Sequence, residues 1–342
     1  MTTNALKLKD PNELLAVIPY LLGFHPTRSL VLVCLSNNRI GLTQRLDLPR
    51  REDAHDIASA LMPSLTAENP DGVILIGFED RDGESLQALE SLTAALQSRA
   101  TKIHDRIVVR DGRWRSLDCH NPSCCPPEGS PVPEPADVSG VVSEFVGRGV
   151  APHRDRESLA RQVEAGPQAA AVATVMRSMQ KVGHFPAVTR AELFAAWPRI
   201  LDPEAPTITA EDAALAALSL LDIELRDAMV AWLCPHTLDL KELSQEVQEL
   251  FLGLQSALQR EEIDPASTGA QIARQDRLIR LCAMLPDNLA APTLSLLASF
   301  TWWRGDGALA RVALARALRC QPDYRLALLL QQMVDLAIRP GR

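Results

Sequence analysis

The chain has 342 residues, carries a formal net charge of −8 and contains 46% hydrophobic residues. This apolar content is ample for a packed core and excludes wholesale disorder. The acidic balance excludes a chain-wide positive field for nucleic-acid phosphates or anionic lipid. The first ten residues lack the apolar run of a secretion signal, and no run is long enough to span a bilayer. We therefore expect a cytoplasmic protein without a membrane partner.

The sequence pattern of the N-terminal third predicts helices and strands in mixed order. Asp10 followed by Pro11 is a typical helix start, and we expect this helix to end near Gly23. The elements expected after it are strand, strand, helix, strand, helix, strand and strand, at residues 29–35, 40–48, 52–65, 73–78, 84–97, 103–109 and 113–117. Continuous apolar strands beside alternating ones predict a mixed sheet covered by helices.

A proline-rich stretch interrupts this pattern between residues 119 and 137 and excludes a helix or a central strand there. From Pro167 onward, successive segments favour helix formers and none predicts a strand. The predicted fold class is therefore α+β. We expect an α/β domain at 1–118, a Cys/Pro-rich loop with a linker and short helices at 119–166, and an all-α domain at 167–342.

The strongest chemical feature is the run Cys119-His120-Asn121-Pro122-Ser123-Cys124-Cys125, which places thiols and an imidazole in one rigid turn. Zinc takes four nitrogen or sulfur ligands, so Cys119, His120, Cys124 and Cys125 are the candidate ligands. No second CxxC follows that would complete a common zinc site. A structural loop without cofactor, a Cys119 to Cys124 disulfide and a redox-sensitive thiol pair remain as alternatives.

A second candidate surface is the hairpin with Arg106, Arg110, Arg113 and Arg115 around Trp114, since arginine and an aromatic ring together can hold a nucleic acid. Acidic neighbours in the same hairpin weaken its field, so a nucleic-acid partner is not expected. The nucleotide-binding, zinc-protease and hydrolase signatures are absent from the sequence. Catalytic residues therefore stay unassigned, and the sequence does not decide whether the protein is an enzyme.

Several blocks of the sequence resemble one known family. The blocks are Asp10-Pro11, Glu13 to Ala16, Pro19 to Phe24, Pro26, Ser29 to Val31, Arg113 to Ser116, Cys119, Cys124 to Gly129, and Trp303 through Tyr324. In combination they resemble an actinobacterial family known only as the domain-of-unknown-function family 4192. This resemblance implies an intracellular bacterial protein, and it implies no activity, substrate or catalytic residue.

The C-terminal segment from Leu294 to Pro322 is similar to a tetratricopeptide-type hairpin, because small and apolar residues recur at that repeat's spacing. It either forms part of a repeat or caps a helical domain. Our first hypothesis is a non-enzymatic interaction or adaptor module that binds an unidentified protein partner through its helical domain. The alternative is a metal-binding or thiol-dependent enzyme or sensor that uses Cys119, Cys124 and Cys125.

Overall fold

A computed structural model describes residues 10–37, 39–50, 53, 56–147, 150–181, 188–237, 243–258 and 268–338. The chain divides into two compact units, Met1–Arg156 and Glu157–Arg342. The first unit contains a mixed sheet and the second contains helices, which confirms the α+β fold class. No helix in the described part of the chain is long and apolar enough to cross a membrane.

The sheet of the first unit has six strands in the order β2-β1-β3-β4-β5-β6. The strands are β1 (Ser29–Ser36), β2 (Arg39–Asp47), β3 (Gly72–Phe78), β4 (Lys102–Arg110), β5 (Arg113–Ser116) and β6 (Ser130–Pro131). β3 and β4 pair in parallel, and the other neighbouring strands pair antiparallel. The sequence did not predict β6. It forms at the sheet edge, where the missing N–H of Pro131 breaks no ladder.

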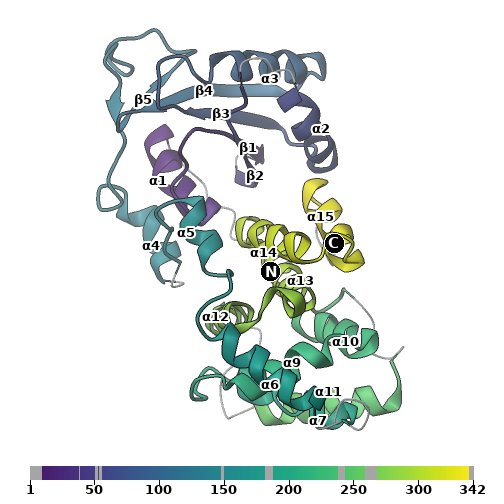
Figure 1. Cartoon of the computed structure of the whole chain (residues 1–342). Coiled ribbons are helices and arrows are strands. Elements are labelled where there is room, and N and C mark those ends of the chain that lie inside the picture. The colour runs from purple at the N-terminus through teal and green to yellow at the C-terminus, as the bar shows by residue number, and fades with distance from the viewer. Residues whose placement is uncertain are drawn as a thin grey trace. The chain divides into compact units, whose positions relative to one another are not determined.

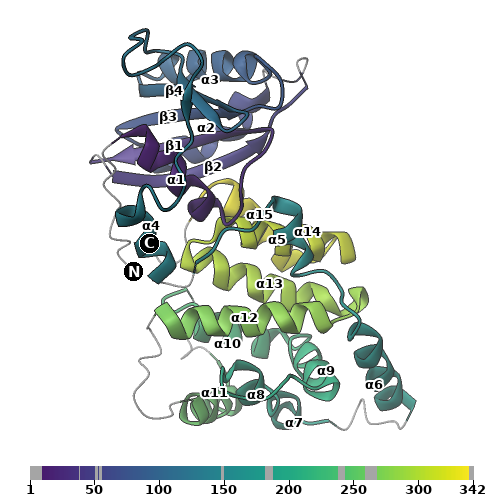
Figure 2. The same cartoon turned by 90° about the vertical axis from the view of Figure 1, so that its left-hand side faces the viewer.

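Helices cover both faces of this sheet. They are α1 (Pro11–Leu22), α2 (Asp56–Glu68) and α3 (Leu86–Ser98), and α4 (Ser139–Gly147) packs against α1. Figures 1 and 2 show α1 on the face opposite to α2 and α3. Burial on both faces explains why Leu30 through Cys34 of β1 are all at most 1% exposed.

The predicted boundaries of α1 are confirmed. The side chain of Asp10 accepts a hydrogen bond from the backbone N–H of Glu13, and Pro11 occupies the first turn. Gly23 ends the helix in the left-handed region, at a φ of 74°. The backbone then pairs with His153, whose N–H donates to the carbonyl of Gly23.

All the elements described in the second unit are helices, as predicted. They are α5 (Arg156–Arg161, which begins at the unit boundary), α6 (Ala169–Lys181), α7 (Arg190–Phe194), α8 (Trp197–Leu201), α9 (Ala210–Ser219), α10 (Ile223–Leu233), α11 (Gln245–Leu258), α12 (Thr268–Met284), α13 (Asp287–Arg304), α14 (Gly307–Cys320) and α15 (Arg325–Asp335). A break separates α7 from α8, and a second break separates α9 from α10. The second break has a clear cause, because Asp222 caps a new helix through the N–H groups of Glu224 and Leu225.

The core of the second unit is built around α13, which is buried from Ala290 through Trp302. It packs against α12 on one side and against α14 on the other (Figure 2). Pro292 lies inside this helix, in its second turn, after the start at Asp287. Gly305, at a φ of 94°, ends α13, and Asp306 caps α14 directly afterwards.

One buried arginine joins several of these elements. The guanidinium group of Arg316 in α14 is 0% exposed and donates to the carbonyl oxygens of Cys282 and Leu285, each at 2.8 Å. It also donates to the carbonyl oxygen of Val163 and, at 3.0 Å, to the carboxylate of Asp287. Arg316 therefore satisfies carbonyl groups at the end of α12 and next to α5.

Candidate functional site: a cluster of thiols

The cysteine loop connects β5 to the edge strand β6, so the sheet fixes both of its ends. At its start, the side-chain oxygen of Ser116 accepts hydrogen bonds from the backbone N–H groups of Asp118 and Cys119, both at 3.1 Å. The same hydroxyl donates to the carboxylate of Asp105 in β4, at 2.6 Å. This network ties the backbone of Cys119 to the sheet.

A compact turn places the other two cysteines. The carbonyl oxygen of Asn121 accepts from the backbone N–H groups of Cys124 and Cys125, at 3.2 and 2.8 Å. The side chain of Asn121 accepts from the N–H of Ser123 at 3.0 Å, which is an Asx turn. The loop folds back because Asn121 bonds residues further along the chain, and the thiols of Cys124 and Cys125 return toward Cys119.

The end of the loop packs closely against β5. Gly129 adopts a φ of 78°, and a Cβ atom there would lie 3.0 Å from the carbonyl oxygen of Trp114. A glycine is therefore required at this position. The indole N–H of Trp114 donates to the side chain of Asn12 at 3.0 Å, which links this edge of the sheet to α1.

The sulfur atoms of Cys119, Cys124 and Cys125 all lie within 4.8 Å of one another. Those of Cys119 and Cys124 are 3.4 Å apart. In a tetrahedral zinc site with bonds of about 2.3 Å, neighbouring sulfurs are separated by about 3.8 Å. The cluster therefore matches the spacing of three metal ligands, and small side-chain rotations suffice to adjust it.

The thiols perturb one another electrostatically. Hydrogen bonds from the backbone of Asn121 and from the thiols of Cys125 and Cys124 lower the pKa of Cys119. The bond that the Cys125 thiol makes with Cys119 raises the pKa of Cys125 to about 11. Of the cluster's thiols, Cys119 is thus shifted toward easier loss of its proton, and a cation at the centre of the cluster would displace thiol protons.

Three of the four predicted ligands are brought together and one is not. The side chain of His120 is exposed and its imidazole lies outside the cluster. His104 and His153, which belong to the same unit, do not join it either. Within the described ranges, no further group of three or more His, Cys, Asp or Glu side chains converges in this way.

The sequence did not identify Ser116 and Asn121 as the residues that shape the site. A signal was present for Asn121, since asparagine next to a proline is typical of turns in which the side chain bonds the backbone. The spacing of these residues alone does not show which backbone N–H groups donate to their side chains.

The arginine-rich hairpin does not form a basic aromatic surface. Trp114 is buried, at 6% exposure. Arg106 forms a two-pronged ion pair with Asp118, and Arg113 donates to the carbonyl oxygen of Gly129 at 2.7 Å. These arginines bind groups of their own unit. Because Asp118 and Gly129 lie near the two ends of the cysteine loop, the hairpin stabilises that loop.

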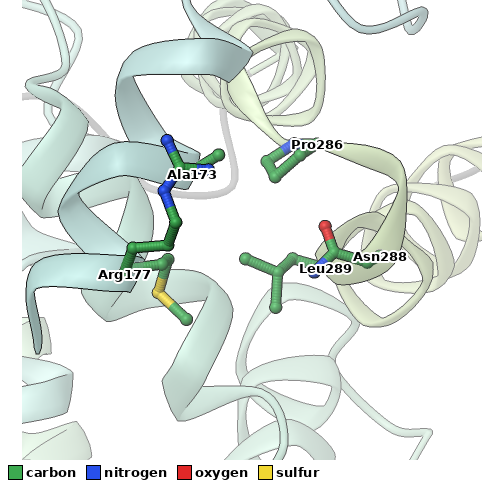
Figure 3. Close-up of a pocket in the computed structure, with 6 residues that line it drawn as sticks. Ala173, Arg177, Pro286, Asn288 and Leu289 are labelled. Carbon is green, nitrogen blue, oxygen red and sulfur yellow. The ribbon is translucent and has the colours of Figure 1, made fainter. Parts of the chain in front are cut away.

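The second unit has a small cavity of about 180 Å³ between α6 and the start of α13 (Figure 3). It is lined by Ala173, Met176, Arg177, Pro286, Asn288 and Leu289. Leu289 points from α13 toward α6, and Arg177 is exposed and donates to Thr174 of its own helix. The cavity is smaller than typical ligand pockets of about 300–1,000 Å³. The thiol cluster is therefore the stronger candidate site.

Comparisons with known proteins agree with the resemblance seen in the sequence. No curated protein and no solved structure shows significant similarity to the chain. The profile of one family matches, and the match extends from residue 11 to residue 341. The chain thus belongs to the DUF4192 family, a family defined by a domain of unknown function.

Proposed function

We propose that this protein binds a thiophilic metal ion, zinc, through the thiolates of Cys119, Cys124 and Cys125. The observation that carries the proposal is the convergence of the three sulfur atoms to within 4.8 Å in a loop anchored at both ends. The backbone bonds of Ser116 and Asn121 hold these cysteines close together, and three converging sulfur donors are the kind of site that a soft cation prefers.

The donor set decides which metal fits. Calcium and magnesium take oxygen ligands, and sulfur ligands instead select zinc, copper(I) or iron–sulfur clusters. Three thiolates provide three of the four positions of a tetrahedral zinc ion. The fourth position is then available to His120, which lies next to Cys119 in the chain, or to a solvent molecule at the exposed Cys124.

The test is the metal content of the full-length chain, purified under reducing conditions without chelator. We expect about one zinc per chain in the wild type and a loss of most of it in Cys124→Ser. Cys320→Ser is the matched control, because Cys320 is a partly exposed cysteine outside the cluster and its replacement should leave the zinc in place. A wild type that holds no zinc and takes up none in a titration would refute the proposal.

A second candidate function is an adaptor role of the helical unit, which a tetratricopeptide-like hairpin of α13 and α14 would suit. The observation that favours it is the set of exposed apolar side chains at the C-terminal helix. Leu329 is 49% exposed and Leu336 is 41% exposed. Apolar side chains in such positions are typical of contacts with another protein.

This second role is tested by cross-linking in cell extract followed by mass spectrometry. We expect the partner cross-linked to the wild type to be lost from the variant with Leu329→Ser and Leu336→Ser. Equal cross-linking of both proteins would contradict a role for this helix.

A further inference from the structure

We infer that the thiol cluster is also a redox switch, in which a hydroperoxide joins Cys119 and Cys124 in a disulfide and thereby releases the bound metal. The release of metal rests on the proposed function. The formation of the disulfide rests on geometry alone and is testable in metal-free protein.

The distance between their sulfur atoms identifies Cys119 and Cys124 as the pair that forms the disulfide. The sulfur atoms of Cys119 and Cys124 are 3.4 Å apart, whereas a disulfide bond is about 2.05 Å long. Rotation about χ1 moves a cysteine sulfur by more than this gap. Both backbones are held in place, that of Cys119 by Ser116 and that of Cys124 by Asn121.

Cys125 is the poorer partner for Cys124. Residues adjacent in the chain have Cα atoms about 3.8 Å apart, below the usual range of about 4.4–6.8 Å for disulfides. A bond between Cys124 and Cys125 would therefore strain the chain. Cys119 is separated from Cys124 by a turn that already brings the two residues together.

Access to an oxidant distinguishes the cluster from other cysteines of the chain. Cys124 is exposed, and Cys119 and Cys125 are partly exposed. Cys34, Cys234 and Cys282 are buried, with exposures of at most 1%. A small peroxide therefore reaches the cluster before it reaches the buried thiols.

The chemistry proceeds in two balanced steps. One thiolate of the pair attacks a peroxide oxygen, the S–O bond forms, the O–O bond breaks, and the leaving oxygen takes up a proton to give water or an alcohol. The second thiolate then attacks the sulfenic sulfur, the S–S bond forms, the S–O bond breaks, and water leaves. Two thiols are oxidised, and one hydroperoxide is reduced. No other co-reactant is required.

Oxidation removes two of the three metal ligands at once. A disulfide sulfur is no longer a thiolate, and Cys125 alone does not hold a zinc ion. The metal is released, and reduction by an added dithiol restores the site. The loop would thus report oxidising conditions through the loss of its metal.

The experiment uses the full chain in two forms, metal-free and loaded with zinc, each treated with one equivalent of hydrogen peroxide. In metal-free protein we expect the intact mass to fall by about 2 Da, through loss of two hydrogens, and peptide mapping to locate the bond between Cys119 and Cys124. In loaded protein we expect one zinc to be released per disulfide, measured with a chromogenic chelator and reversed by dithiothreitol plus zinc.

The variants separate the two proposals. Cys125→Ser should still form the bond in metal-free protein, and Cys119→Ser should not, while Cys320→Ser should behave as wild type. A bond between Cys124 and Cys125, or oxidation to sulfinic acid without a bond, would overturn the switch even if zinc binds. Formation of the Cys119 to Cys124 bond in a protein that never binds zinc would refute the metal function and leave the thiol pair standing.

Discussion

Replacement of Arg316 by methionine tests how the helical unit is held together. The guanidinium group is fully buried and donates to the carbonyl oxygens of Val163, Cys282 and Leu285, all from buried residues. Methionine fills much of the same volume but offers no donor. The variant therefore removes the donor to the carbonyl oxygens of Val163 and Leu285, whereas that of Cys282 still accepts the N–H of Leu285 at 3.2 Å. A second effect, on Asp287, is small because that side chain is 65% exposed.

The magnitude follows from these contacts. An unsatisfied buried acceptor costs about 1–3 kcal/mol, and relief from burying the charge itself offsets part of the total. We expect a loss of about 3–5 kcal/mol in the free energy of unfolding of the second unit. With an m-value of about 2–3 kcal/mol/M, the urea midpoint of this unit should fall by about 1–2 M.

The assay is urea unfolding followed by far-ultraviolet circular dichroism, to which this helical unit contributes strongly. The control is Arg319→Met, in the same helix and also paired, through Glu164, but with a side chain that is 58% exposed. An exposed pair contributes about 0–1 kcal/mol, so its midpoint should barely move. If Arg316→Met and Arg319→Met unfold at the same urea concentration, the buried network does not stabilise the unit as we argue.

Three further predictions concern single side chains. Burial raises the pKa of Asp212, but hydrogen bonds from Arg199 and Thr209 lower it below its ordinary value. Asp212→Asn should therefore lower the free energy of unfolding by about 2 kcal/mol near neutral pH. This difference between variant and wild type should vanish as the pH falls below about 4 and through the folded-state pKa of Asp212. A stability difference that does not change with pH in urea titrations would contradict this. Gly129→Ala should destabilise the first unit by about 1–3 kcal/mol in thermal unfolding, since its φ is positive and its Cβ would press on a carbonyl oxygen; an unchanged midpoint would show that the loop relaxes freely. Ser116→Ala should weaken zinc binding about 10–100-fold in competition with a chromogenic chelator, because two N–H groups that hold the loop lose their acceptor. Unchanged affinity would mean that the sulfurs converge without this anchor.

The strands of the first unit were predictable because their side chains carry the signal. Val73 to Phe78 is an uninterrupted apolar run, and β3 is buried as such a run requires. β1 and β2 pair as a hairpin, and Asn37 between them adopts a positive φ of 52°, which asparagine tolerates better than most residues. β6 was not predictable, since its two residues lie in a proline-rich stretch and pair only because β5 is already there.

The candidate site shows the same division. The residue types in the run from Cys119 to Cys125 indicate sulfur ligands, and this part was read from the sequence. The sequence did not show which of the neighbouring donors converge, because convergence depends on the hydrogen bonds of Ser116 and Asn121 with the backbone rather than on spacing. His120 illustrates the point, as it adjoins a cluster member in the chain yet lies outside the cluster.

The position of the cysteine loop between two paired strands has a consequence for how a metal would act. In a small zinc finger the ion supplies the core, and the chain unfolds without it. Here β5 and β6 already close the loop, and the buried sheet behind them does not depend on the cysteines. Most of the entropic cost of bringing the ligands together is thus part of folding and precedes the binding of the ion. Metal gain or loss would change a short surface segment while the sheet stays folded, so the protein can pass repeatedly between the two states without unfolding.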